Sequence, residues 1–332
     1  MTRDQLAGAA RAALGGGRRL ESVERLAGGT RKGVYRLTMD DAATAIAYLW
    51  EESENYWPTG EGDGDLANPF SPGAGLDLFE AAHARLDALG LRVPEVHLVD
   101  RDHTHCPADL ALVEDFPGED LMDLLDRDPR AAKPTMAHLA DALAAMRRHR
   151  APSFGKVALI DGGGESRAVS CEEAAFDFAM VCLAQAASRD RRIADARDRL
   201  EERLRELTAS VRPRAEYSVV HGELGLDHVL VDRDGNPVLI DIEDLMYFDA
   251  EWEHAFLRLR HSEDHYRRLA VEGLDENRLA LYTLTQRLSL TAGPLRLLEG
   301  DFPHRAFLRG IAEHHLNQAL ALVSVVRVEG SG

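Results

Sequence analysis

Residues 217–253, YSVVHGELGLDHVLVDRDGNPVLIDIEDLMYFDAEWE, decide the fold of this chain. The middle of this stretch holds two short apolar runs rich in β-branched residues, 229–231 and 238–240. The polar segment between them contains Asp234 and Gly235, and Asp-Gly between strand-like runs is the strongest short-range signal for a β-hairpin. We therefore predict a hairpin in which Asp234 and Gly235 are the two turn residues.

The predicted turn sets the register of the hairpin. Counting outward from the turn, His228 opposes Asp241, and opposed residues share a face with Cβ atoms about 5 Å apart. A second carboxylate, Glu243, follows the hairpin, and His221 and Glu223 precede it. Carboxylates and imidazoles gathered at the open end of a small hairpin are plausible ligands for a divalent cation.

The order and spacing of these residues resemble the catalytic segment of the aminoglycoside phosphotransferase and choline kinase group, the small-molecule branch of the protein-kinase-like fold. That group carries His-Gly-Asp, an Asn five residues after the Asp, a strand ending in Ile-Asp-Trp-Glu, and Gly-Asp-Pro with a further Asp. The corresponding positions here are 221–223, His228, 240–243, 248–250 and Glu253. Two departures from the pattern matter for chemistry: Glu223 replaces the base Asp, and His228 replaces the metal-binding Asn.

The resemblance implies an α+β fold of two lobes. A small β-rich N-terminal lobe, residues 1–116, would bind the nucleotide, and a mostly helical C-terminal lobe, residues 117–332, would carry catalysis and the substrate site. It also implies transfer of the γ-phosphate of ATP or GTP to a hydroxyl group of a small molecule. An antibiotic is the leading substrate class, and a protein of the same fold that binds ligands without phosphoryl transfer is the alternative.

The same resemblance suggests a role for each residue of the segment. Asp241 is expected to hold Mg²⁺, with His228 and Glu243 as further ligands. Mn²⁺ is the alternative metal, because imidazole is a poorer ligand for Mg²⁺ than an amide oxygen. Glu223 is expected to accept the proton of the acceptor hydroxyl, and His221 to fix the catalytic loop through hydrogen bonds.

A glycine-rich turn lies between two predicted strands, residues 20–26 and 34–38. Backbone N–H groups of such a turn can approach phosphates closely, and in the fold that this chain resembles the turn covers ATP, although a glycine-rich hairpin is often only a hairpin. The residues expected at the phosphates are Gly28, Gly29, Thr30, Lys32 and Gly33. Glu114 and Phe116, at the end of a predicted strand over 110–116, are expected to line the adenine pocket.

The predicted strand over residues 43–50 lacks the lysine that the family carries there, and no Lys or Arg occurs from position 37 to 84. Either the chain no longer transfers phosphate, or another cation takes the place of that lysine. We favour the second explanation, with Lys32 and its neighbour Arg31 as the candidates. The acid that pairs with the family's lysine corresponds to Glu80 on a predicted helix over 76–89, and an ordinary surface residue of that helix is the alternative.

Composition limits the classes of function. The chain has 332 residues, 45% of them hydrophobic, and a formal net charge of −18, which argues against binding nucleic acid and is compatible with a cationic substrate. We expect no partnership with a membrane, since no run is apolar enough to span one. Three scattered cysteines favour a reducing, cytoplasmic location. Lysine is scarce and occurs only at positions 32, 133 and 156.

Periodicity predicts the remaining elements. A further strand is expected over residues 91–96, and helices over 4–14, 136–147, 172–187, 190–207, 252–260, 263–269, 277–290 and 305–326. The helix over 277–290 is expected to break at Gly293-Pro294. The long loop 51–75 carries Tyr56 and Trp57, which could form an aromatic wall near a ligand or pack the loop against its lobe.

Overall fold

The computed structural model describes residues 1–27, 29–58 and 64–324. The chain forms two compact units. Unit 1 comprises Met1–Trp57, Pro72–Ala142 and Leu226–Asp244, and unit 2 comprises Pro58–Ser71, Leu143–Gly225 and Leu245–Gly332. The division into lobes at position 116 stays a prediction.

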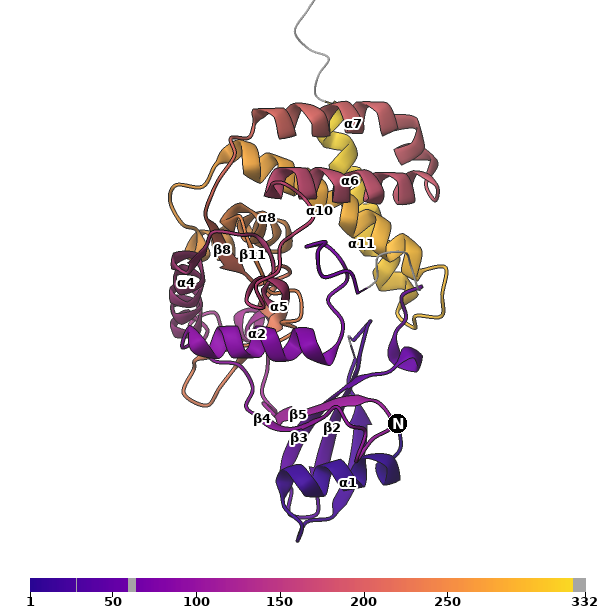
Figure 1. Ribbon diagram of the computed structural model, residues 1–332, viewed down its shortest axis with the longest axis vertical. Coiled ribbons are helices and arrows are strands. Elements are labelled where there is room, and N and C mark those ends of the chain that lie inside the picture. Colours follow the sequence, from indigo (N-terminus) through magenta and orange to yellow (C-terminus); the bar gives the residue numbers. More distant parts are fainter. Residues whose placement is uncertain (28, 59–63, 325–332) are drawn as a thin grey trace, which may run out of the picture. The chain divides into compact units, whose positions relative to one another are not determined.

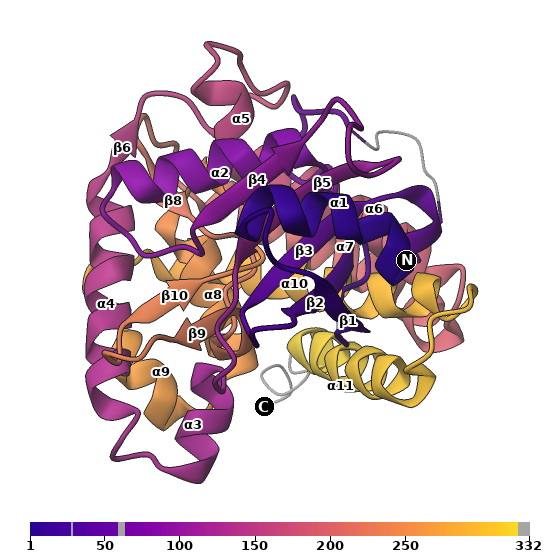
Figure 2. The ribbon, with the colours of Figure 1, turned by 90° about the horizontal axis from the view of Figure 1, so that it is seen from below.

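Unit 1 is built on a five-stranded antiparallel sheet in the order β1-β2-β3-β5-β4. Its strands are β1 (Leu20–Arg25), β2 (Gly33–Met39), β3 (Thr44–Trp50), β4 (Val96–Asp100) and β5 (Asp109–Glu114). Helix α1 (Arg3–Leu14) lies across one face of the sheet (Figures 1 and 2). Residues of β2 are alternately buried and half-buried, and its Leu37 and Met39 share a core with Leu6 of α1. This alternation is what a strand with one face on a core requires.

The hairpin of unit 1 is formed by β9 (Val229–Val231) and β10 (Pro237–Leu239), beside α3 (Leu121–Arg127). Val231 pairs with Pro237, so the prediction of a two-residue turn is wrong by one position. The loop has three residues between Asp232 and Asn236, and Gly235 takes the left-handed conformation at φ 79° that such a loop favours.

Unit 2 is largely helical (Figure 1). Helix α10 (Glu276–Leu297) packs against α6 (Cys171–Ala187), α7 (Arg191–Ser210), α8 (Ala250–Arg260) and α11 (Arg305–Ser324). A small sheet has the strand order β6 (Arg150–Ala151), β8 (Tyr217–Val220), β11 (Met246–Phe248) and β7 (Gly155–Lys156). The other helices of the chain are α2 (Leu76–Ala88), α4 (Lys133–Arg148), α5 (Val157–Ile160) and α9 (Glu263–Leu269), with short 3₁₀ turns η1 (Glu52–Glu54) and η2 (Leu226–His228).

The α+β prediction is confirmed, with an antiparallel sheet followed by a largely helical region. Two element predictions are wrong. The strand expected over 91–96 begins only at Val96, because Pro94 cannot donate to a ladder. Helix α10 continues through Pro294, since packing on four neighbouring helices stabilises it beyond its local propensity.

Two predictions, the end of the last helix and the lack of a membrane span, are compared only with the described residues. The last helix is described to Ser324, so positions 325 and 326 of its predicted range lie outside them. None of the helices in ranges 1–27, 29–58 and 64–324 is long and apolar enough to cross a bilayer.

Candidate functional site

In unit 1, the ammonium group of Lys32 lies between two carboxylates. Its Nζ donates to Asp241 Oδ1 at 3.0 Å and to Glu243 Oε1, and it also lies 4.9 Å from the centre of the Tyr48 ring. The Lys32 side chain is only 10% exposed and that of Glu243 only 4%. The turn before β2 therefore supplies a buried cation to the acids that follow β10.

The charge of Lys32 follows from this arrangement. Burial of the ammonium opposes ionisation, but the carboxylates of Glu243 and Asp241 outweigh it and raise the pKa of Lys32 above its usual value. Lys32 is therefore protonated at neutral pH. A fixed positive charge at this place is able to attract a phosphate group.

Asp241 occupies a conformation that reorients the chain after the hairpin, since its φ is 58°. A positive φ is uncommon for a residue other than glycine and is found most often for Asn and Asp. The Asp241 side chain is 49% exposed, and its Oδ2 lies 3.8 Å from Nε2 of His228. The prediction that these two side chains lie together is confirmed, although the register that led to it is wrong.

The predicted metal ligands differ in how accessible their donor atoms are to a cation. Asp241 and His228 present partly exposed oxygen and nitrogen atoms on one side of the hairpin, a donor set that fits a divalent ion. The Glu243 carboxylate is buried against Lys32. Within the described part of the chain, no group of three or more His, Cys, Asp or Glu residues is arranged to hold a metal. The metal assignment stays a prediction.

The glycine-rich turn has two positions where a side chain would not fit. A Cβ on Gly29 would lie 2.4 Å from the Lys32 carbonyl oxygen, and one on Gly33 would meet Tyr35 and Glu54 at under 3 Å. Glycine therefore allows the tight turn that directs Lys32 inward. Gly28, which we expected at the phosphates, lies outside the described residues.

The segment after β3 packs against the glycine-rich turn. Trp57 Nε1 donates to Thr30 Oγ1 at 3.0 Å, the backbone N–H of Tyr56 donates to the Thr30 carbonyl, and the Arg31 guanidinium lies 4.5 Å from the centre of the Trp57 ring. Of the two interpretations of these aromatic residues, the structure shows packing within unit 1. Thr30, predicted at the phosphates, is also a contact of this segment.

Glu54 is a buried acid that sequence reasoning overlooked. It accepts hydrogen bonds from Tyr35 Oη and from Arg25 Nε, the latter at 3.1 Å. Burial, together with the hydrogen bond to Glu54, raises the pKa of Tyr35 to about 12. This cluster joins the first two strands to η1 beneath the glycine-rich turn, and only the spacing in three dimensions could have revealed it.

The remaining nucleotide-site candidates of unit 1 contact arginines. Glu80 pairs with Arg101, whereas Lys32 pairs with Asp241 and Glu243. At the end of β5, Arg92 pairs with Glu114 and lies 5.4 Å from the centre of the Phe116 ring. The structure therefore does not bring Glu80 to Lys32, and it gathers Glu114 and Phe116 around one arginine.

In unit 2, Glu253 holds the backbone of the loop that contains Glu223. The Glu253 carboxylate accepts the backbone N–H groups of residues 221, 222 and 224, and the neighbouring Trp252 Nε1 donates to the Gly222 carbonyl at 3.0 Å. His221 is fully buried, whereas Glu223 is exposed. Helix α8 thus fixes the loop while leaving the Glu223 carboxylate accessible.

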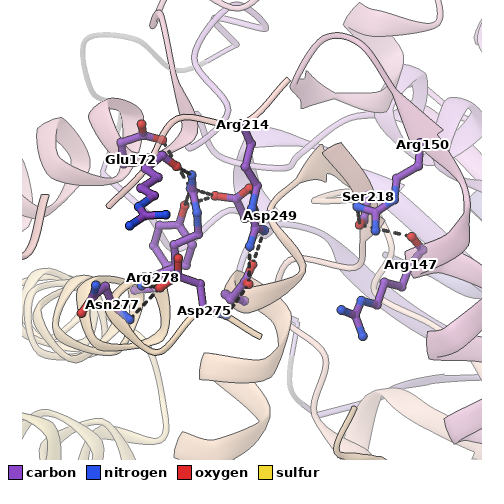
Figure 3. A network of polar contacts seen from close by, with 12 residues as sticks. Arg147, Arg150, Glu172, Arg214, Ser218, Asp249, Asp275, Asn277 and Arg278 are labelled. Atoms are coloured by element: carbon purple, nitrogen blue, oxygen red, sulfur yellow. Dashed lines mark hydrogen bonds and ion pairs between the residues drawn. The ribbon is translucent and has the colours of Figure 1, made fainter. Parts of the chain in front are cut away.

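A second acid of the same segment, Asp249, is buried in an ion-pair network (Figure 3). It accepts from the Arg278 guanidinium and from Tyr282 Oη, and Arg278 also contacts Glu172 at 3.3 Å. Since Asp249 precedes α8 and Arg278 belongs to α10, the network joins the two helices next to the loop. Burial raises the pKa of Asp249, and Arg278 opposes this effect.

Comparisons with known proteins agree with this arrangement of elements. Residues 22–293 match the model of a family described as the phosphotransferase enzyme family. No match is found among curated proteins.

Solved structures share the fold. The choline kinase LicA from Streptococcus pneumoniae is 16% identical with a TM-score of 0.57, covering 92% of this chain and 94% of its own. The GDP and kanamycin complex of APH(2″)-IIIa is 18% identical with a TM-score of 0.58, covering 91% and 94%. A thermostable mutant of aminoglycoside phosphotransferase APH(4)-Ia is 16% identical with a TM-score of 0.57, covering 90% and 95%. The prediction of a protein-kinase-like fold is thereby confirmed.

Proposed function

The chain belongs to the phosphotransferase enzyme family, and from this premise we propose that it transfers the γ-phosphate of ATP or GTP to a hydroxyl group of a small molecule. The observation that carries the proposal is the contact of Lys32 with Asp241 and Glu243. A cation and two carboxylates at the end of a hairpin are the groups that phosphoryl transfer requires around a nucleotide.

Lys32 is proposed to replace the strand lysine that the family carries. It comes from the glycine-rich turn rather than from β3, and Tyr48 of β3 faces its ammonium at 4.9 Å. The buried acid beside it is Glu243 instead of a residue of α2, since Glu80 pairs with Arg101. On this proposal Lys32 neutralises phosphate charge, and Glu243 keeps it protonated and positioned.

Asp241 and His228 are the side chains proposed to hold the divalent metal, with Glu243 contributing through Lys32. A bound Mg²⁺ or Mn²⁺ would neutralise charge on the phosphate oxygens. His228 supplies nitrogen where oxygen is usual for Mg²⁺, which favours testing Mn²⁺ alongside it.

Glu223 is proposed to accept the proton of the acceptor hydroxyl or to orient that hydroxyl. Its accessibility and the rigid attachment of its loop to Glu253 support the assignment. His221, buried at the start of the loop, is proposed to support the loop and to make no contact with substrate.

The acceptor is proposed to be a hydroxylated small molecule, with antibiotics as the first class to test and cationic compounds favoured by the net charge of −18. Two similar structures point to such acceptors in their own cases, one in complex with kanamycin and one a choline kinase. A nucleotide-binding protein without transfer is the alternative. The observations that favour it are the missing lysine of β3 and the exchanges at Glu223 and His228.

A thermal-shift series tests the proposal. The protein is heated with ATP, GTP or their non-hydrolysable analogues, each with Mg²⁺, Mn²⁺ or EDTA. A ligand at a hundred times its Kd adds about 2.7 kcal/mol to the free energy of unfolding, so metal-dependent stabilisation by one nucleotide identifies the donor. Transfer to a panel of hydroxylated antibiotics and choline is then measured by mass spectrometry. Stabilisation without any transfer would favour the alternative, and no stabilisation would contradict both.

A further inference from the structure

Unit 2 contains a group of arginines that the proposed reaction does not use. Arg147 and Arg148 end helix α4, and Arg150 begins β6. An open pocket of about 350 Å³ is lined by Arg147, Arg150 and Arg214, and a second of about 460 Å³ by Arg147, Arg148 and Arg150. The two pockets share Arg147 and Arg150, and we call their combined lining the arginine pocket.

The charges of this surface are not balanced. Arg214 is neutralised by Glu251, which accepts two hydrogen bonds from its guanidinium at 2.6 and 2.7 Å (Figure 3). In contrast, the side chains of Arg147, Arg148 and Arg150 contact no carboxylate among residues 1–27, 29–58 and 64–324. The lining residues include two acids, Glu216 and Glu251. Since Glu251 pairs with Arg214, Glu216 is the lining acid left to face the three other positive charges, in a chain whose net charge is −18.

Two of the arginines are held in place by neutral partners. Ser218 is fully buried; its hydroxyl accepts from Arg150 Nη1 at 2.7 Å and donates to the Arg147 carbonyl at 3.3 Å (Figure 3). Arg147 Nη1 donates to the Glu272 carbonyl at 2.9 Å. These contacts order the side chains without cancelling their charge, which is the state in which a guanidinium pairs well with an added anion.

His254 is a buried histidine within the electrostatic influence of Arg147. Burial, and then the charge of Arg147, lower the pKa of His254 to about 4. Arg258 adds to this effect and Glu251 opposes it.

We propose that the arginine pocket binds a compact multivalent anion, a phosphate-bearing small molecule, through residues that differ from those of the proposed nucleotide site. Planar guanidinium groups pair with phosphate oxygens through two parallel hydrogen bonds, and three of them suit a group that carries more than one negative charge. The pocket takes its lining from α4, β6, the segment before β8 and the start of α8, and includes no residue of the glycine-rich turn.

The site is also connected to the catalytic loop. Ser218, which holds Arg150, lies on β8, and β8 leads after Val220 into His221 and the loop that carries Glu223. Arg150 is therefore hydrogen-bonded to the strand that leads into that loop.

Calorimetric titration with pyrophosphate, in low salt and with EDTA present, tests the proposal. We expect saturable binding by the wild type, at least about tenfold weaker in the double variant Arg147→Ala/Arg150→Ala, because each lost guanidinium removes charge-assisted hydrogen bonds. The Arg150→Lys variant keeps the positive charge but loses the planar guanidinium group. Its affinity for pyrophosphate should lie between those of the wild type and the double variant. Citrate serves as a second titrant, to distinguish phosphate from carboxylate recognition.

One control makes the test specific. Arg197→Ala removes an exposed arginine of α7 and should leave binding unchanged. No binding by the wild type, or equal binding by the double variant, would overturn the proposal. Binding of pyrophosphate by a protein that binds no nucleotide would overturn the proposed function and support the arginine pocket.

Discussion

Lys32 and Glu243 form a buried ion pair in which each residue depends on the other. The exposed fractions of their side chains are 10% and 4%, so removal of the ammonium would leave a carboxylate without its counter-charge. Such a loss is more harmful than replacement of both charges, because an uncompensated buried charge is poorly solvated.

We expect Lys32→Met to lower the free energy of unfolding by about 3–5 kcal/mol and to raise the KM for the nucleotide strongly. Urea unfolding measures the first effect and steady-state kinetics the second. The matched variant Lys32→Met/Glu243→Gln should recover part of the stability without recovering the KM. An unchanged KM in both variants would remove Lys32 from the nucleotide site.

Glu223 is the exposed carboxylate of the loop, so its replacement should affect chemistry more than folding. We expect Glu223→Ala to lower kcat by roughly 10²–10⁴-fold, the contribution usual for a general base, with nucleotide binding by thermal shift unchanged. Glu202→Ala, which removes an exposed acid of α7, is the matched control. Transfer at the wild-type rate by the Glu223 variant would contradict its assignment as the base.

At the scale of elements, helix α8 acts on the loop through Glu253, a positioning residue whose carboxylate accepts hydrogen bonds from the loop backbone. Glu253→Ala leaves three buried N–H groups without their acceptor, which should destabilise the protein by about 3 kcal/mol or more. We expect kcat to fall while the KM for the nucleotide changes little. Glu253→Gln retains one oxygen acceptor and should have an intermediate kcat. If the Ala variant retained both kcat and stability, α8 would not hold the loop.

Hydrophobic periodicity in the sequence predicted those elements that bury one face on a core. The strands β1, β2 and β3 and the long amphipathic helices follow the predicted ranges closely, because one face of each packs on a core. Strands of two or three residues, such as β6, β7 and β11, carry too few positions to show a period. Their pairing depends on partners distant in the chain.

The candidate site shows the same limit. That His228 lies near Asp241 could be predicted from a hairpin, but the three-residue loop and the positive φ of Asp241 could not. Glu243, a partner of Lys32, lies 211 positions away from it in the chain. Glu253 matches the further Asp of the family's pattern, but its contact with the loop backbone is one that only tertiary structure reveals.

At the scale of the whole molecule, two buried histidines link stability to pH. Burial lowers the pKa of His254 to about 4 and that of His315 to about 3, in each case with nearby arginines adding to the effect. His315 Nδ1 contacts Arg287 Nη1 at 2.8 Å, which requires an unprotonated nitrogen. The folded state therefore keeps both rings neutral where the unfolded chain binds protons.

Because the folded pKa values lie below the unfolded value, their stabilising contribution is complete above about pH 6.5 and is lost as pH falls toward 4. We expect His254 alone to account for roughly 2–3 kcal/mol of unfolding free energy between pH 7 and pH 4.5, measured by urea unfolding. His254→Gln should reduce the slope over this window. A slope equal to that of the wild type would show that His254 titrates normally.

The scarcity of lysine gives the Lys32 contact a practical consequence. Of the three lysines, Lys133 is exposed and Lys156 is 1% exposed, so an amine-reactive reagent applied to the native protein meets few competing side chains. Acylation at Lys32 requires a deprotonated amine that has left Asp241 and Glu243. The extent of modification at Lys32, measured by peptide mapping, therefore reports how often the Lys32 amine leaves its two carboxylates.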